Sequence, residues 1–162
     1  MIKISRFAEL GTNKESIMLD LITDDNIVKA LYFNERDFLS QSIPVGFNRK
    51  RLIYSNIYPY RFVPKITQDQ STFITMSFNF KPCGVTFKYG FIYFYIITHE
   101  SLVRTDIGML RYDYIINQID ELFNRSRDIT IGQLEFNDMD EFILHDGNWV
   151  GAYIKYKAVD FQ

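Results

Sequence analysis

An apolar run decides how this chain folds: residues 91–97 read Phe91-Ile92-Tyr93-Phe94-Tyr95-Ile96-Ile97. A strand whose side chains are apolar in both alternating sets is buried on both faces of its sheet. The run therefore predicts a central strand over Thr86–Thr98 with a helix on one of its faces. A second sheet or a neighbouring subunit would cover the other face.

A long amphipathic helix is predicted downstream, after a polar loop that ends at Gly108. At 100° per residue, the apolar residues of the segment Met109–Phe123 fall within about 120° of arc. These residues are Tyr112, Ile115, Ile116, Ile119, Leu122 and Phe123. We expect this face to pack onto the sheet, with Arg111 and Tyr114 outside it and Tyr114 free to meet a partner.

Two strands are predicted before the central run, over Ile57–Ile66 and Thr72–Phe80. The first contains Pro59 and Pro64, and proline within a strand favours an edge position or a bulge. Because all three segments follow one another closely, they predict a sheet of neighbouring strands.

The first 33 residues predict an arm and two short helices. Residues 1–11 form the arm, and Thr12 with Glu15 fits a capping box that would begin a helix. Asp24 and Asp25 fall among the apolar positions of that helix. We expect the helix to break there, with one of the two aspartates capping a second helix.

Residues 34–56 have no clear periodicity and contain the basic triplet Arg49-Lys50-Arg51. Loops longer than about 15 residues are uncommon in compact domains and are often functional. A solvated connection with a short strand near Leu52–Tyr54 is the alternative. We expect a contact surface here rather than part of the core.

Three strands are predicted at the C-terminal end, over Ile129–Phe136, Phe142–His145 and Trp149–Val159. Asp146-Gly147 between the last two favours a two-residue type I′ turn, and hence a C-terminal β-hairpin. The acidic run Glu135–Glu141 is expected to be a solvated loop between strands. Residues 1–162 thus form a single α+β domain, with an N-terminal helical segment and an antiparallel or mixed sheet packed by one long helix.

Composition and motifs offer no catalytic machinery. The chain has 162 residues and a net charge of −2, which argues against a polybasic nucleic-acid binder. Its two histidines, His99 and His145, and its single cysteine, Cys83, have no partners at catalytic or metal-binding spacing. No apolar stretch is long enough to cross a membrane. We expect no catalytic residue, no cofactor and no metal.

The order of the elements resembles the neck proteins of tailed bacteriophages, most of all the tail terminator or tail-completion proteins. The resemblance is one of pattern, carried by the strand and loop of residues 91–108, the helix of 109–123 and the ending of 129–136 with 151–161. It implies a homo-oligomeric ring, usually a hexamer, at the head–tail interface of the virion, assembled in the host cytoplasm. Its partners would be other neck, connector and tail tube proteins, and DNA would be met only in the ring lumen, without sequence specificity.

Charged and aromatic residues of the loops and of the outer helix face are the candidate interface. They are Arg49, Lys50, Arg51, Arg104, Asp106, Arg111 and Tyr114. The alternative function is a small phage or bacterial enzyme, or a host-directed binding protein, that uses the loop region around His99.

Overall fold

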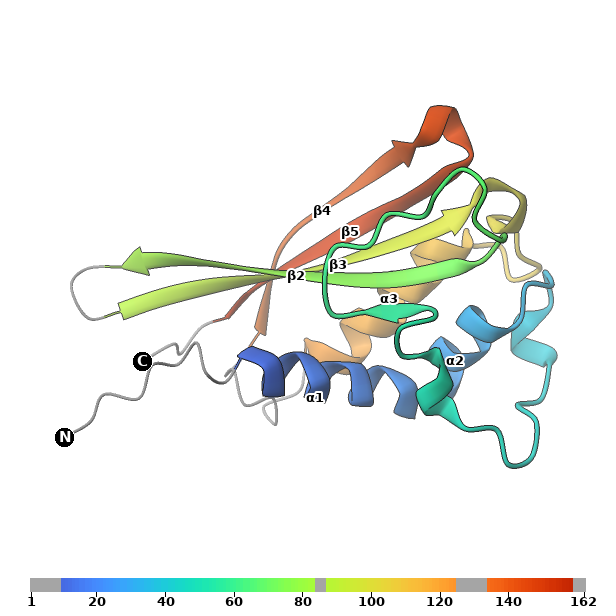
Figure 1. Cartoon of the computed structure of the whole chain (residues 1–162), viewed down its shortest axis with the longest axis horizontal. Helices are drawn as coiled ribbons and strands as arrows, with labels where there is room; N and C mark the ends of the chain where they lie inside the picture. Colours follow the sequence, from blue (N-terminus) through green and yellow to red (C-terminus); the bar gives the residue numbers. More distant parts are fainter. Residues whose placement is uncertain (1–9, 84–86, 125–133, 159–162) are drawn as a thin grey trace.

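The chain forms an α+β domain in which three helices lie over one face of a mixed sheet (Figure 1). This computed structural model describes residues 10–83, 87–124 and 134–158. The helices are α1 (Leu10–Thr23), α2 (Asp25–Tyr32) and α3 (Arg111–Phe123). The strands are β1 (Ile57–Tyr58), β2 (Thr72–Cys83), β3 (Phe87–His99), β4 (Leu134–Leu144) and β5 (Trp149–Ala158).

The sheet has the strand order β1-β2-β3-β5-β4. β1 pairs with β2 in parallel, and every other pairing is antiparallel. The predicted central strand is confirmed, because β3 lies between β2 and β5. Gly151 permits the approach of β5 to β3, since a Cβ at this position would lie 1.8 Å from the backbone oxygen of Ile96.

The helix layer contains more than the one long helix that the sequence predicts. The predicted apolar face of α3 is confirmed: Ile115, Ile119 and Phe123 are buried, and Leu122 is partly buried. Helix α2 packs beside α3, and α1 packs on α2. The sheet face under these helices supplies the main core through Ile74, Met76, Ile92, Phe94, Ile96, Ala152, Ile154 and Tyr156.

The break between the first two helices lies where the sequence places it. Asp24 has extended backbone angles and caps α2, its Oδ1 accepting a 2.9 Å hydrogen bond from the backbone N–H of Ile27. The predicted start of α1 is wrong, because the helix begins at Leu10 and already contains Thr12. Most of the predicted arm, residues 1–9, lies outside the described residues.

The predicted strand Ile57–Ile66 is wrong beyond its first two residues. β1 ends at Tyr58, because Pro59 has no backbone N–H to continue the pairing. The segment 59–71 then crosses the sheet face opposite the helices, where the Phe62 ring stacks on Tyr58 at 4.0 Å. It covers one end of this face over a second apolar cluster of Tyr58, Phe73, Ile97 and Trp149.

The acidic run predicted as a loop is instead the middle of β4. A register shift between Phe136 and Asp138 lets the strand pair with β5 from Leu134 to Leu144. The predicted strand over Ile129–Phe136 is described only from Leu134 onward. Four residues join β4 to β5 rather than a two-residue turn, and His145, Asp146 and Gly147 have positive φ angles of 51°, 55° and 96°.

Residues 34–56 contribute to the core, contrary to expectation. Two short 3₁₀ helices, η2 (Phe38–Ser40) and η3 (Arg49–Leu52), give this segment local structure. The side chains of Phe38 and Leu52 are buried in the main core. Because these two residues anchor it, only the stretches between and beside them remain available as a surface.

β2 and β3 extend beyond the rest of the sheet as a two-stranded ribbon, toward the left of Figure 1. They pair from Thr72–Thr98 out to Cys83–Phe87, whereas β5 pairs with β3 no further along than Gly90 in the described residues. An isolated two-stranded ribbon is marginally stable in water. Among the described residues, the outer part of the ribbon has no third strand of the kind that supports its inner part.

Candidate interaction surfaces

The basic triplet lies on η3, at the C-terminal end of α1. Arg49 pairs with Asp25, and its Nη1 donates to the backbone oxygens of Ile22 and Thr23 at 3.0 and 3.3 Å. A cation at a helix C-terminus stabilises the unpaired carbonyls and the helix dipole. Arg49 thus has a structural role, whereas Lys50 and Arg51 are exposed.

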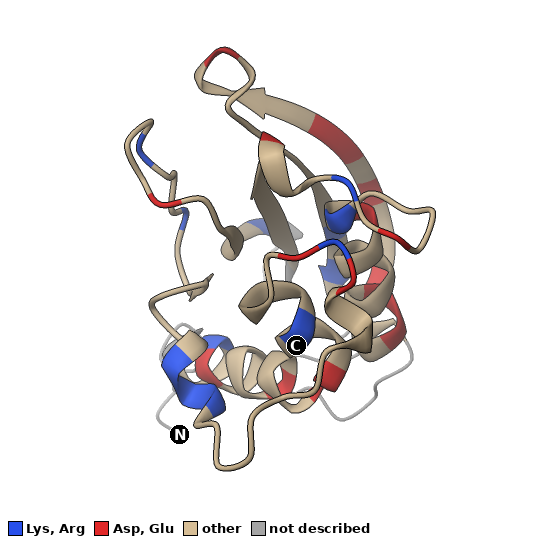
Figure 2. Ribbon diagram, turned by 90° about the vertical axis from the view of Figure 1, so that its right-hand side faces the viewer, with Lys and Arg blue, Asp and Glu red and all other residues tan. Residues whose placement is uncertain are grey.

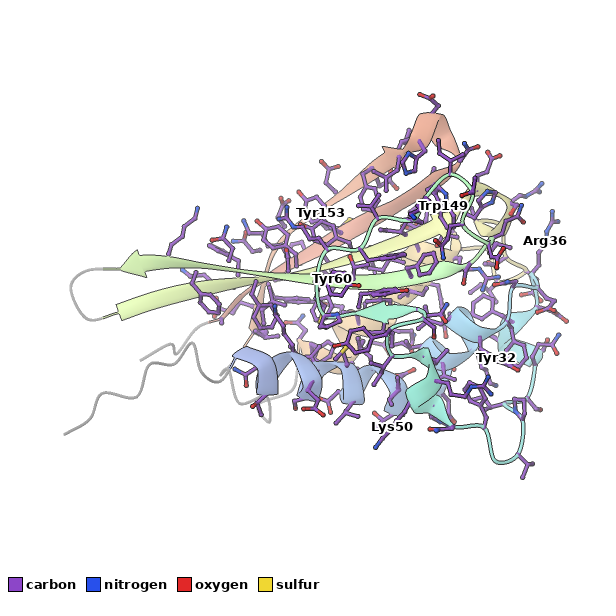
Figure 3. The ribbon with its side chains drawn as sticks, in the orientation of Figure 1. Tyr32, Arg36, Lys50, Tyr60, Trp149 and Tyr153 are labelled. Atoms are coloured by element: carbon purple, nitrogen blue, oxygen red, sulfur yellow. The ribbon has the colours of Figure 1, made fainter. Side chains whose placement is uncertain are left out.

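An exposed tyrosine lies beside these two cations. Tyr54 is 62% exposed and has a φ of 64°, which is unfavourable for a residue with a bulky side chain. Its backbone N–H is held by the carbonyl of Ile57 at 2.8 Å. Lys50, Arg51 and Tyr54 together form a surface that we call the basic knob, and Lys50 and Tyr54 also line a hollow of about 650 Å³ beside α1. Figure 3 shows Lys50 on the helix side of the molecule, away from Tyr153 on the opposite sheet face.

Arg111 is buried, so its predicted place on an exposed helix face is wrong. Its guanidinium donates hydrogen bonds to five backbone carbonyls around the C-terminal end of α2 and in the loop before α3. Burial lowers the pKa of Arg111 to about 10, against the opposing effect of Glu35. The acceptors are Leu102, Ala30, Phe33, Asn34 and Glu35.

Tyr114 is also buried, which corrects the expectation that it faces outward. Its ring contacts Phe38 edge-on at 5.5 Å between centroids. On the same side of α3, the Asn26 side chain donates to Gln118 at 3.3 Å. The second side of α3 therefore packs against α2 and η2. Of the remaining candidates, Arg104 and Asp106 are exposed in the loop before α3.

A groove of about 570 Å³ lies between α3 and β4. Its floor is apolar: Phe136 is 56% exposed and Met139 38% exposed, because α3 lies mainly over β3 and β5. The residues that line it are Asp113, Ile116, Asn117, Asp120, Asn124, Phe136, Met139 and Ile154. We call this feature the acidic groove.

The carboxylates at the acidic groove are crowded. Burial raises the pKa of Asp113, and the nearby charge of Glu141 raises it further. Neither Asp113 nor Glu141 has an ion pair with a lysine or arginine that the structure describes. The groove therefore combines exposed apolar side chains with carboxylates that have no ion pair among the described residues. The groove was not predicted from the sequence, because Glu135–Glu141 resembles a solvated loop; Phe136 and Met139 within this acidic run were its local signal.

The sheet face opposite the helices carries partly exposed aromatic rings beyond the part covered by 59–71. Tyr93 and Tyr95 stack at 5.8 Å, and Tyr153 contacts both. Cations lie over these rings, with Lys155 5.2 Å from the Tyr93 ring and Arg61 5.6 Å from the Tyr95 ring. The aromatic side chains of this face therefore contact other residues of the same chain. The Tyr153 hydroxyl also donates a hydrogen bond to Asp138 at 3.0 Å.

The two histidines make structural contacts. His99 Nδ1 lies 3.2 Å from the backbone nitrogen of Ser101 and caps a short 3₁₀ turn, while its ring meets Trp149 edge-on. His145 Nε2 lies 2.8 Å from the backbone oxygen of Pro64. Among the described residues, no three histidine, cysteine, aspartate or glutamate side chains are grouped to hold a metal ion. The backbone of Cys83 ends β2, and residues 84–86 lie outside the described residues.

Among the comparisons with known proteins, the match is to a family model. A family model described as YomW matches residues 24–158, from the N-cap of α2 to the end of β5. No curated protein and no solved structure shows a significant match. In the described part of the chain, no helix has the length and apolar character needed to span a bilayer.

Proposed function

The chain belongs to the YomW family, which is phage-associated, and from this we propose that it is a structural subunit of the phage particle, placed in a ring at the head–tail interface. The ring is a homo-oligomer, most simply a hexamer, and joins other neck, connector and tail tube proteins. The protein has no enzymatic role in this proposal. It assembles in the host cytoplasm and remains in the virion.

The observation that carries the proposal is the projecting β2–β3 ribbon. Lys81–Cys83 and Phe87–Tyr89 pair only with each other, without a third strand among the described residues. Because a two-stranded ribbon is marginally stable alone, packing against another chain would stabilise it. In a ring, a neighbouring subunit would supply that packing.

The distribution of charge supports a ring rather than a symmetric pair. A ring needs two different, complementary patches on each subunit, and it closes when the rotation between subunits divides the circle. The basic knob and the acidic groove are two such patches with opposite charge. DNA would meet only the surface that lines the ring lumen, without base-specific contacts.

Deleting the coding sequence from the phage genome tests the proposal. We expect the deletion to yield separate heads and tails by electron microscopy, and the wild-type chain supplied in trans to restore joined particles. Normal infectious particles from the deletion strain would exclude the structural role.

A further inference from the structure

The acidic groove presents apolar and acidic side chains side by side. Phe136 and Met139 remain exposed on its floor, and Asp113 and Glu141 lack a described cation partner. Its volume lies within the range of about 300–1,000 Å³ that ligand-binding clefts occupy. An occupant that fits it combines positive charge with an apolar or aromatic side chain.

The basic knob of the same chain has this combination. Lys50 and Arg51 are exposed cations, and Tyr54 presents an exposed ring beside them. Tyrosine and arginine are enriched in protein interfaces and often dominate their binding energy. The backbone strain at Tyr54 is the kind of feature that gathers at functional sites.

We propose that the basic knob of one subunit docks into the acidic groove of the next. Tyr54 lies against Phe136 and Met139 on the apolar floor, while Lys50 and Arg51 pair with Asp113 and Glu141 at the rim. This inference rests on the proposed ring and names the contact that builds it.

The position of the two surfaces favours a second copy as the occupant. Figure 2 shows η3 at the lower left of the molecule and the acidic positions of β4 and α3 along its right-hand side. Because the knob and the groove lie on opposite sides, they cannot satisfy each other within one chain. The same contact repeated between copies is heterologous, as a ring requires.

Charge reversal in the full-length chain tests the contact. One variant carries Lys50→Glu with Arg51→Glu, a second carries Asp113→Lys with Glu141→Lys, and a third combines all four changes. Sedimentation over a wide range of protein concentration measures self-association. We expect each pair of changes to weaken association by about tenfold or more, because like charges then face each other, and the combined variant to recover it.

A matched control reverses two exposed cations away from the knob, with Arg36→Glu and Lys65→Glu, and should leave association unchanged. A second variant, Tyr54→Gly, removes the ring while relieving the positive φ. We expect this variant to fold with undiminished thermal stability and to associate more weakly. A Tyr54 with only a local structural role would leave association unaffected.

The results of these experiments test the docking contact separately from the proposed ring. Failure of the combined variant to recover, unchanged association after either reversal, or a wild-type chain that stays monomeric at every concentration would overturn the docking. Rings in particles that contain either reversal variant alone would overturn it too, while leaving the ring role intact. Absence of the chain from particles would count against the ring role alone, because association in solution tests the docking separately.

Discussion

The hydroxyl of Tyr156 donates a 2.5 Å hydrogen bond to Oδ1 of Asp120, which ties β5 to α3 beneath the acidic groove. Burial raises the pKa of Tyr156 well above its ordinary value of 10.0, and the Asp120 carboxylate raises it further. The hydroxyl therefore stays protonated and acts as a fixed donor. This bond holds one rim residue of the groove in place.

Replacing Tyr156 with phenylalanine tests the contribution of this bond. Tyr156→Phe keeps the ring packed on Phe94 but leaves Oδ1 of Asp120 without its donor. We expect the free energy of unfolding in urea to fall by about 1.5–3 kcal/mol, as for hydrogen bonds to charged groups. Tyr153→Phe, whose hydroxyl meets exposed Asp138, is the control and should cost less than about 0.5 kcal/mol. Equal losses in both variants would contradict this account.

The same bond predicts a pH dependence. Because the folded state keeps Tyr156 protonated, its contribution is complete below the ordinary tyrosine pKa of 10.0. Above that pH the unfolded tyrosine ionises while the folded one does not, so stability declines. Tyr156→Phe should reduce the slope of unfolding free energy against pH on the alkaline side, and an unchanged slope would be inconsistent with the raised pKa.

Arg111 is predicted to be essential to the fold rather than to an interface. Arg111→Met removes the donors for five carbonyls, including those of Phe33 and Glu35, and should cost more than about 3 kcal/mol. Arg111→Lys should recover only part of this loss, because an ammonium cannot reproduce the planar fork. Arg104→Met, at an exposed position, should stay within about 0.5 kcal/mol of wild type. Chemical denaturation measures all three, and a small effect of Arg111→Met would disprove the buried network.

Ile119 tests the packing of α3 on the sheet. The side chain is fully buried, so Ile119→Ala should reduce the free energy of unfolding by about 2–5 kcal/mol. Leu122→Ala, at the partly buried edge of the same face, should cost less. The reverse order in thermal or urea unfolding would show that the face is oriented differently.

The raised pKa of Asp113 predicts how the stability of the free chain depends on pH in the acidic range. Its pKa is raised by burial and by Glu141, so the folded state binds this proton more tightly than the unfolded state. Stability of the free chain therefore falls as pH rises through the interval just above the ordinary aspartate pKa of 3.8. Asp113→Asn should flatten this part of the profile of melting temperature against pH. An identical profile in the variant would show that Asp113 is not perturbed.

Local signals in the sequence were sufficient to predict several elements of the fold. A cap at Asp24 or Asp25 was predicted because these aspartates interrupt an apolar helical pattern, and the α3 core face was predicted from a clear 3.6-residue period. Arg111 and Tyr114 were misplaced for a related reason. A period identifies the strongest apolar face of a helix, but it does not show that a second helix packs on the other side.

The C-terminal strands were harder to predict. The register shift at Asn137 breaks the alternation of β4, and an edge strand rich in aspartate and glutamate resembles a solvated loop. The acidic groove depends on how α3 lies relative to β4, which is a long-range arrangement. Its residues lie far apart in the chain, so no local pattern could bring Asp113 together with Met139.

Imaging of intact particles is the strongest test of the proposed ring. Cryo-electron microscopy of purified phage, with the chain labelled by a small C-terminal tag, would locate it. The account predicts a closed ring of this subunit at the junction of head and tail, with the β2–β3 ribbon of each copy in contact with another chain. Particles in which the label is absent from this junction, or in which the ribbon contacts no other chain, would contradict it.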